Sequence, residues 1–160
     1  MARSSQLLVS ALVTGSVASV VSTIALAALA NAEGKSPVQP TNSTSHWLHG
    51  DDAGRRETVD FAHTGVGFAT HHASALFWAL PFEAWLVSNP PRSNGELLRD
   101  AAVMSAVAAA VDYGLTPKRL TPGWELTLTK PSMVGAFASL ALGLAGGALL
   151  SAHLRQRLDI

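Results

Sequence analysis

Histidine and aspartate are the residues of this chain whose types and spacing could do chemistry. Three of its 6 histidines fall in one otherwise apolar stretch, His63-Thr-Gly-Val-Gly-Phe-Ala-Thr-His71-His72. An ionisable side chain within hydrocarbon is costly, and where one is found it usually serves a function. The chain has no cysteine, which excludes disulfides, thiolate metal sites and cysteine nucleophiles. Imidazole and carboxylate groups must therefore carry most of any chemistry.

One hypothesis is a divalent transition metal, because imidazole and carboxylate ligands suit Zn, Fe, Cu or Mn. The candidate ligands are His46, His49, His63, His71, Asp60 and Asp112. His46 and His49 have the spacing of one helical face. The His-Glu-x-x-His pattern of zinc hydrolases is missing. Haem needs axial ligands from opposite sides, and only one apolar stretch carries central histidines, so haem would require two copies of the chain.

Two other hypotheses use the same residues. Titrating histidines together with Asp60 or Asp112 could form a path for protons or ions. Alternatively, the histidines form hydrogen bonds between helices, and the protein is an accessory or structural subunit, or an assembly factor, of a membrane complex. The sequence holds no glycine-rich phosphate loop and no nucleophile with a matching triad. We therefore expect no catalytic residues and favour the accessory role.

The composition indicates that lipid surrounds most of the chain. Only 14% of residues are charged and 48% are apolar, whereas soluble domains contain roughly 25% charged residues. The 11 basic and 11 acidic residues cancel, so nothing favours binding to nucleic acid. The bilayer is the expected partner.

Four apolar stretches predict four spans, at about residues 7–30, 58–80, 97–115 and 132–150. Each is near the ~20 residues that cross ~30 Å of hydrocarbon. The long loop is 31–57 and the second loop 116–131. The expected fold is all-α, a single transmembrane domain over residues 1–160 that forms an integral membrane four-helix antiparallel bundle. Cleavage after Ala32, at a sequence that imitates a signal-peptidase site, is the alternative to a retained first helix.

Local signals predict where the helices begin and end. Asp51 and Asp52 offer an N-cap for the second helix, with residues 55–57 as its first turn. Pro81 should kink or end that helix. Ser93 and Glu96 have the spacing of a capping box at the start of the third.

Small residues recur at helical spacing and predict close packing between helices, because small side chains let membrane helices approach. The predicted packing residues are Gly135, Ser139, Gly143, Gly147, Ser151, Gly15 and Ser19. The partner helix can belong to the same chain or to a second copy, so a homo-oligomer and a larger membrane complex both stay open.

Antiparallel connectivity sorts the polar residues by depth. His46, His49, Asp60, His63 and Asp112 should lie at the end that carries both long loops. His71 should lie about 12 Å deeper than His63, at 1.5 Å per residue. Glu83 and His153 should lie at the opposite surface.

Three segments carry a resemblance to a known group of proteins. They are Asn42 to Trp47 with its Ser-His-Trp, the His-His-Ala-Ser of residues 71–74, and Asp112 to Glu125 with its Leu-Thr-Pro-Gly-Trp-Glu. In these segments the chain resembles a group of small polytopic inner-membrane proteins of proteobacteria that have no known activity. The resemblance implies a multi-pass location in the bacterial inner membrane, and it implies no mechanism.

Overall fold

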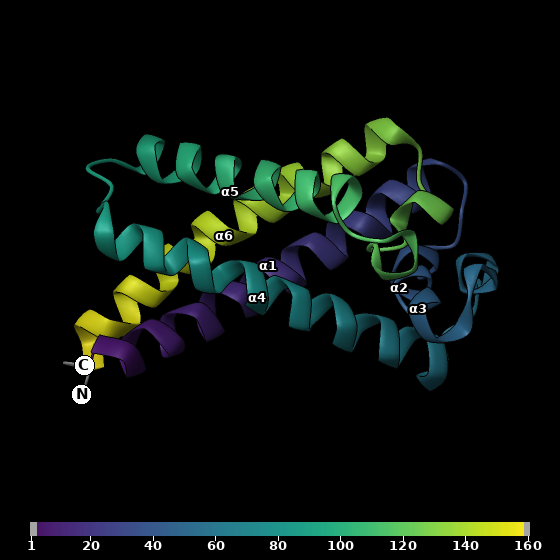
Figure 1. Ribbon diagram of the computed structural model, residues 1–160, viewed down its shortest axis with the longest axis horizontal. Helices are drawn as coiled ribbons and strands as arrows, with labels where there is room; N and C mark the ends of the chain where they lie inside the picture. Colours follow the sequence, from purple (N-terminus) through teal and green to yellow (C-terminus); the bar gives the residue numbers. More distant parts are fainter. Residues whose placement is uncertain (1–2, 159–160) are drawn as a thin grey trace.

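Four long helices form the body of the molecule in the computed structural model, which describes residues 3–158. They are α1 (Arg3–Ala32), α4 (Val66–Ser88), α5 (Asn94–Gly114) and α6 (Lys130–Leu158). Successive helices run in opposite directions, so the two ends of the chain lie together and both long loops lie at the other end (Figure 1). The described residues form no strand. The all-helical prediction is confirmed.

Two of these helices, α1 and α6, are long and apolar enough to cross a membrane. Helices α4 and α5 are less apolar. Both carry ionisable groups within their length, such as His71 and Glu83 on α4 and Asp100 and Asp112 on α5.

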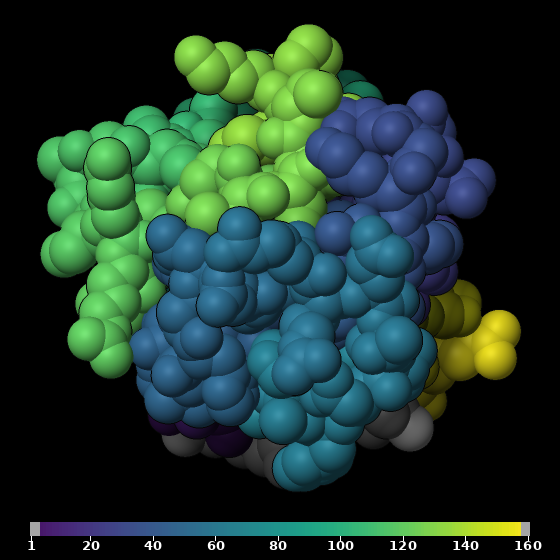
Figure 2. Space-filling view, turned by 90° about the vertical axis from the view of Figure 1, so that its right-hand side faces the viewer, coloured from purple at the N-terminus to yellow at the C-terminus, as the bar shows by residue number. Residues whose placement is uncertain are grey.

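The loop end is built from short helical segments. They are α2 (Gln39–Ser43), α3 (His46–His49), η1 (Asp51–Arg55), the π turn η2 (Phe61–Gly65), η3 (Lys118–Leu120) and η4 (Trp124–Leu126). Seen from this end, the two loops cover the ends of the long helices (Figure 2). Gly123 joins them: its φ of 82° suits glycine, and a Cβ there would collide with the carbonyl oxygen of Ser43. The two loops therefore pack backbone to backbone.

Glycine allows the long helices to approach closely. A Cβ on Gly143 or Gly147 of α6 would lie 2.6 Å from the Cα of Ala18 or Thr14 on α1. A Cβ on Gly15 would lie 2.7 Å from the Cα of Leu76 on α4. These contacts are between backbones, so a larger residue would have to push the helices apart.

The other four predicted packing residues have different surroundings. Gly135 lies near only the side chain of Leu29. The hydroxyl of Ser139 donates to the carbonyl of Ala136 in its own helix at 2.6 Å. Ser151 and Ser19 are buried, and Arg155 donates to the Ser151 hydroxyl at 2.8 Å.

Small polar side chains are buried between the long helices, and large apolar ones are exposed on their outer faces. Thr14, Ser19 and Ser22 are fully buried along the inner face of α1, whereas Ile24 on α1 and Phe77 on α4 are each 65% exposed. Soluble proteins bury their large apolar side chains and expose most serine and threonine. The distribution seen here matches helices that contact each other through small and polar residues and present their apolar side chains outward.

The second long helix is displaced along the sequence from its predicted range. It begins at Val66 because residues 51–55 form their own turn and the carboxylate of Asp60 caps the π turn that follows, accepting from the N–H of His63 at 2.7 Å. The predicted cap at Asp51 and Asp52 and the predicted first turn at residues 55–57 are therefore wrong.

The helix then continues past Pro81 to Ser88, so Pro81 does not end it. Proline removes one backbone donor, a loss that neighbouring helices can compensate in membrane proteins. The start of α5 agrees with its prediction, since the Ser93 hydroxyl accepts from the N–H of Glu96 at 3.2 Å.

Candidate functional site

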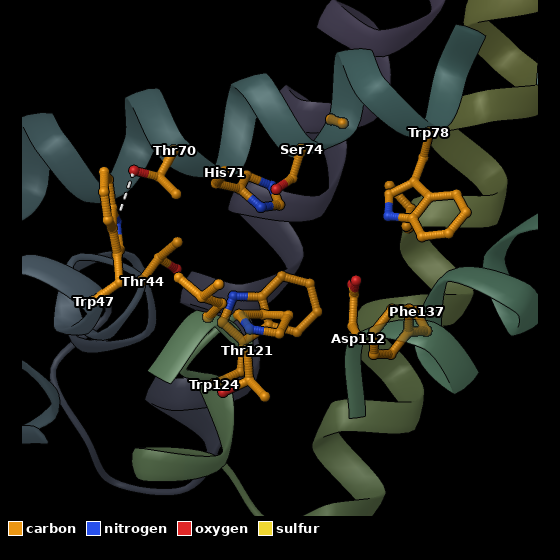
Figure 3. Close-up of a pocket in the computed structure, with 14 residues that line it drawn as sticks. Thr44, Trp47, Thr70, His71, Ser74, Trp78, Asp112, Thr121, Trp124 and Phe137 are labelled. Atoms are coloured by element: carbon orange, nitrogen blue, oxygen red, sulfur yellow. Dashed lines mark hydrogen bonds between the residues drawn. The ribbon is translucent and has the colours of Figure 1, made fainter. Parts of the chain in front are cut away.

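A cavity of about 250 Å³ lies at the loop end of the bundle. Helices α4 and α5 diverge toward this end (Figure 1), and the loop between α5 and α6 fills part of the wedge between them. The residues that line the cavity are Thr44, Trp47, Thr70, His71, Ser74, Ala75, Trp78, Asp112, Leu120, Thr121, Pro122, Trp124, Phe137 and Leu140. Figure 3 shows His71 and Asp112 entering it from different helices.

His71 is held by a hydrogen bond to α1. Its Nε2 lies 2.8 Å from the hydroxyl oxygen of Ser22. The same hydroxyl lies 2.7 Å from the carbonyl oxygen of Ala18, so Ser22 links the imidazole to the backbone of α1.

Asp112 approaches from α5. Its carboxylate points into the cavity, toward the indole of Trp78 (Figure 3). None of the ion pairs found among residues 3–158 includes Asp112. Lys118 and Arg119, the basic residues that follow it in the sequence, are exposed.

Aromatic side chains from four segments form much of the wall. Trp47 of α3 donates its indole N–H to the hydroxyl of Thr70 at 3.1 Å, which fixes its ring against α4 (Figure 3). Trp124 of η4 is buried, and its ring centre lies 5.6 Å from that of His71 and 5.3 Å from that of Phe137. Within residues 3–158 the indole N–H of Trp124 has no hydrogen-bond partner.

His46 has a structural position between the two loops. It is buried, and its Nε2 donates to the carbonyl of Thr121 at 2.9 Å. Its Nδ1 lies 3.7 Å from a carboxylate oxygen of the exposed Asp51. These contacts hold the second loop over the cavity.

His49 and His63 form a separate pair nearer the surface, with ring centres 4.6 Å apart. The Nε2 of His49 donates to the carbonyl of Ala62 at 3.0 Å, and the Nδ1 of His63 lies 3.0 Å from Asp60. The backbone N–H of His63, followed by its side chain, lowers the pKa of Asp60.

The six predicted metal ligands thus occupy three places: His46 between the loops, His49 with Asp60 and His63, and His71 with Asp112 at the cavity. In the described part of the chain no three histidine, aspartate or glutamate residues form a group that could hold a metal ion. This arrangement offers no support for one ion shared by all six, and the metal and haem hypotheses stay predictions.

Sequence reasoning missed the partners of the ionisable residues. Glu83, expected at the surface, is only 3% exposed and accepts a hydrogen bond from the hydroxyl of Thr14. Thr14 and Ser22 lie eight residues apart on α1, and His71 and Glu83 lie twelve residues apart on α4. Both intervals are multiples of four, so each pair lies near one helix face. This pattern was a signal that could have paired Thr14 with Glu83 and Ser22 with His71.

Comparisons of the chain with family models, with curated proteins and with solved structures give no match. The geometry of the site is accordingly the basis for its interpretation.

Proposed function

We propose that the chain is a four-span integral protein of the bacterial inner membrane. At 1.5 Å per residue, the 23 residues of α4 and the 21 residues of α5 extend about 34 Å and about 32 Å, which is enough to cross ~30 Å of hydrocarbon. Their outer faces are apolar, with Phe77 on α4 and Val103 on α5 exposed. Lipid is the solvent that such faces require, because contiguous apolar surface is rare on soluble monomers.

Extraction of membranes at alkaline pH tests the embedding. The protein should stay in the membrane pellet after carbonate treatment and dissolve only with detergent. Release of the protein into the aqueous fraction would contradict the proposal.

The role that the geometry supports best is binding: the protein binds a small molecule at the loop end of the bundle. The observation that carries this proposal is the cavity that His71 and Asp112 line together with aromatic rings. Binding sites are typically concave and mostly apolar, with a few polar groups that fix the ligand's orientation. The cavity of about 250 Å³ lies just below the 300–1,000 Å³ of drug-sized sites, which favours a small ligand.

Several contacts favour binding over catalysis. The Nε2 of His71 is engaged by Ser22, and His46 and Trp47 are both engaged in contacts that hold the walls together. These contacts hold the walls of the cavity in place, as a binding site requires. A second copy or a larger membrane complex as partner stays a prediction, as does a path for protons or ions.

Native mass spectrometry tests the binding role without knowledge of the ligand. Protein released from its membrane in mild detergent should carry a small-molecule adduct. The substitution Ser74→Phe, at a residue that lines the cavity, should fill it and remove the adduct. The adjacent Ala73→Phe is the matched control, because Ala73 is exposed and does not line the cavity. An adduct that persists equally in both variants would contradict the proposed binding role.

A further inference from the structure

The charge and the walls of this cavity indicate the class of its ligand, an inference that rests on the proposed binding role. The carboxylate of Asp112 enters a mostly apolar space and has no basic partner among residues 3–158. A carboxylate removed from water is stabilised by a cation or by hydrogen bonds. Trp78, toward which the carboxylate points, carries no charge (Figure 3).

The walls are of a kind that attracts cations. Three of the chain's 4 tryptophans, Trp47, Trp78 and Trp124, line the cavity together with Phe137. The face of an indole ring attracts a cation within about 6 Å of its centre, and the attraction strengthens when water is excluded. Aromatic rings around one carboxylate are the surroundings that an alkylated ammonium group requires.

We propose that the cavity binds an organic cation, an alkylated ammonium group on a short chain. The ammonium group lies against Asp112 and the tryptophan rings that line the cavity. The same group occurs on a free amino alcohol and on a phospholipid headgroup, and the cavity lies where α4 and α5 diverge (Figure 1).

Choline and its uncharged isostere 3,3-dimethylbutan-1-ol form a matched pair of probes, because a carbon atom replaces the charged nitrogen. Titration of the purified protein, followed by tryptophan fluorescence, should show saturable binding of choline. The isostere should bind at least about tenfold more weakly, a difference of roughly 1.4 kcal/mol. Equal binding of the two probes would overturn the cation proposal while leaving small-molecule binding intact.

Substitutions at Asp112 test the source of this preference. Asp112→Asn should weaken choline binding about tenfold and leave binding of the isostere unchanged, whereas Asp112→Glu should keep the preference for choline. The control Asp52→Asn, at an exposed acid that pairs with Arg55, should change neither. If Asp112→Asn does not fold, loss of the preference in a folded Asp112→Glu variant would contradict the proposal.

Nanodiscs separate the two sources of the ammonium group. If a lipid headgroup occupies the cavity, choline should bind more weakly in phosphatidylcholine discs than in phosphatidylethanolamine discs, which have the same net charge. Equal choline affinity in both would assign the cavity to a free amino alcohol. Absence of choline binding in both kinds of disc and in detergent would overturn the cation proposal, while a native adduct lost in Ser74→Phe would still support the binding role.

Discussion

The hydroxyl of Ser22 on α1 and the Nε2 of His71 on α4 are hydrogen-bonded across a distance of 2.8 Å. This bond joins α1 to the wall of the cavity. It fixes the orientation of the imidazole, because both groups are buried. The same bond therefore serves both helix packing and the shape of the site.

Ser22→Ala should destabilise the folded protein by about 1 kcal/mol, since it removes the hydroxyl that bonds to the buried Nε2 of His71. Membrane double-mutant cycles average ~0.6 kcal/mol for such bonds. Unfolding in detergent, followed by circular dichroism, measures the change. Ser19→Ala is the control, because the equally buried Ser19 hydroxyl has no partner within residues 3–158. Equal loss of stability in the two variants would show that the bond between Ser22 and His71 does not stabilise the fold.

Gly147→Ala should destabilise the bundle by about 1–3 kcal/mol, the usual cost of overpacking. The new Cβ would lie 2.6 Å from the Cα of Thr14, so α6 would have to move away from α1. Gly146→Ala one residue earlier meets nothing within 4 Å and should be neutral or stabilising. Thermal unfolding of both variants in the same detergent makes the comparison, and a neutral Gly147→Ala would show that the helices are not held this closely.

Thr14→Val should cost roughly 1–3 kcal/mol because the buried Glu83 loses the hydroxyl that donates to it. Glu83→Gln should change stability little, since an amide oxygen accepts the same bond. Thr23→Val is the matched control on α1, where the hydroxyl has no partner within the described residues. A destabilised Glu83→Gln beside a neutral Thr14→Val would show that Glu83 acts through its charge and not through this bond.

Glu33 should make stability depend on acidity. Hydrogen bonds from Lys35, and then from the hydroxyls of Ser132 and Thr129, lower the pKa of Glu33 from 4.5 to about 2. A lowered pKa stabilises the folded state above pH 4.5, and this stabilisation is lost as the pH falls toward 2. The melting temperature of the wild type should therefore exceed that of Glu33→Gln near pH 6, and the gap should close in acid. The control Glu57→Gln, at an exposed residue, should have the same melting temperature as the wild type at both pH values.

The sequence predicts the long helices well because their apolar length and small-residue spacing are local signals. The stretches at 7–30 and 132–150 lie within α1 and α6, and the Ser93 cap is where its spacing places it. The start of α4 was missed because Asp51 and Asp52 have the appearance of a cap, whereas the packing of the loop against α2 places Asp60 at the start of the helical segment. Asn42, for example, donates to the carbonyls of Arg56 and Thr58 and so holds the segment before Asp60 extended.

The site was predicted in part. Antiparallel connectivity was enough to place Asp112 at the same end as the histidines. It could not show that His46 turns away to Thr121 or that Trp124 returns from the second loop to lie beside His71. Those contacts depend on how the two loops fold over each other. Loops have no hydrophobic periodicity, so their packing cannot be predicted from a single sequence.

Labelling of single cysteines tests the central claim, that α4 and α5 cross the membrane and carry the cavity between them. The chain has no native cysteine, so each introduced thiol reports alone. Arg92→Cys, between α4 and α5, and Lys118→Cys, beside the cavity, are both exposed. In intact cells a membrane-impermeant maleimide should label one of the two and not the other, because four spans place them on opposite sides. Labelling of both from the same side would mean that only α1 and α6 cross, and would contradict the account.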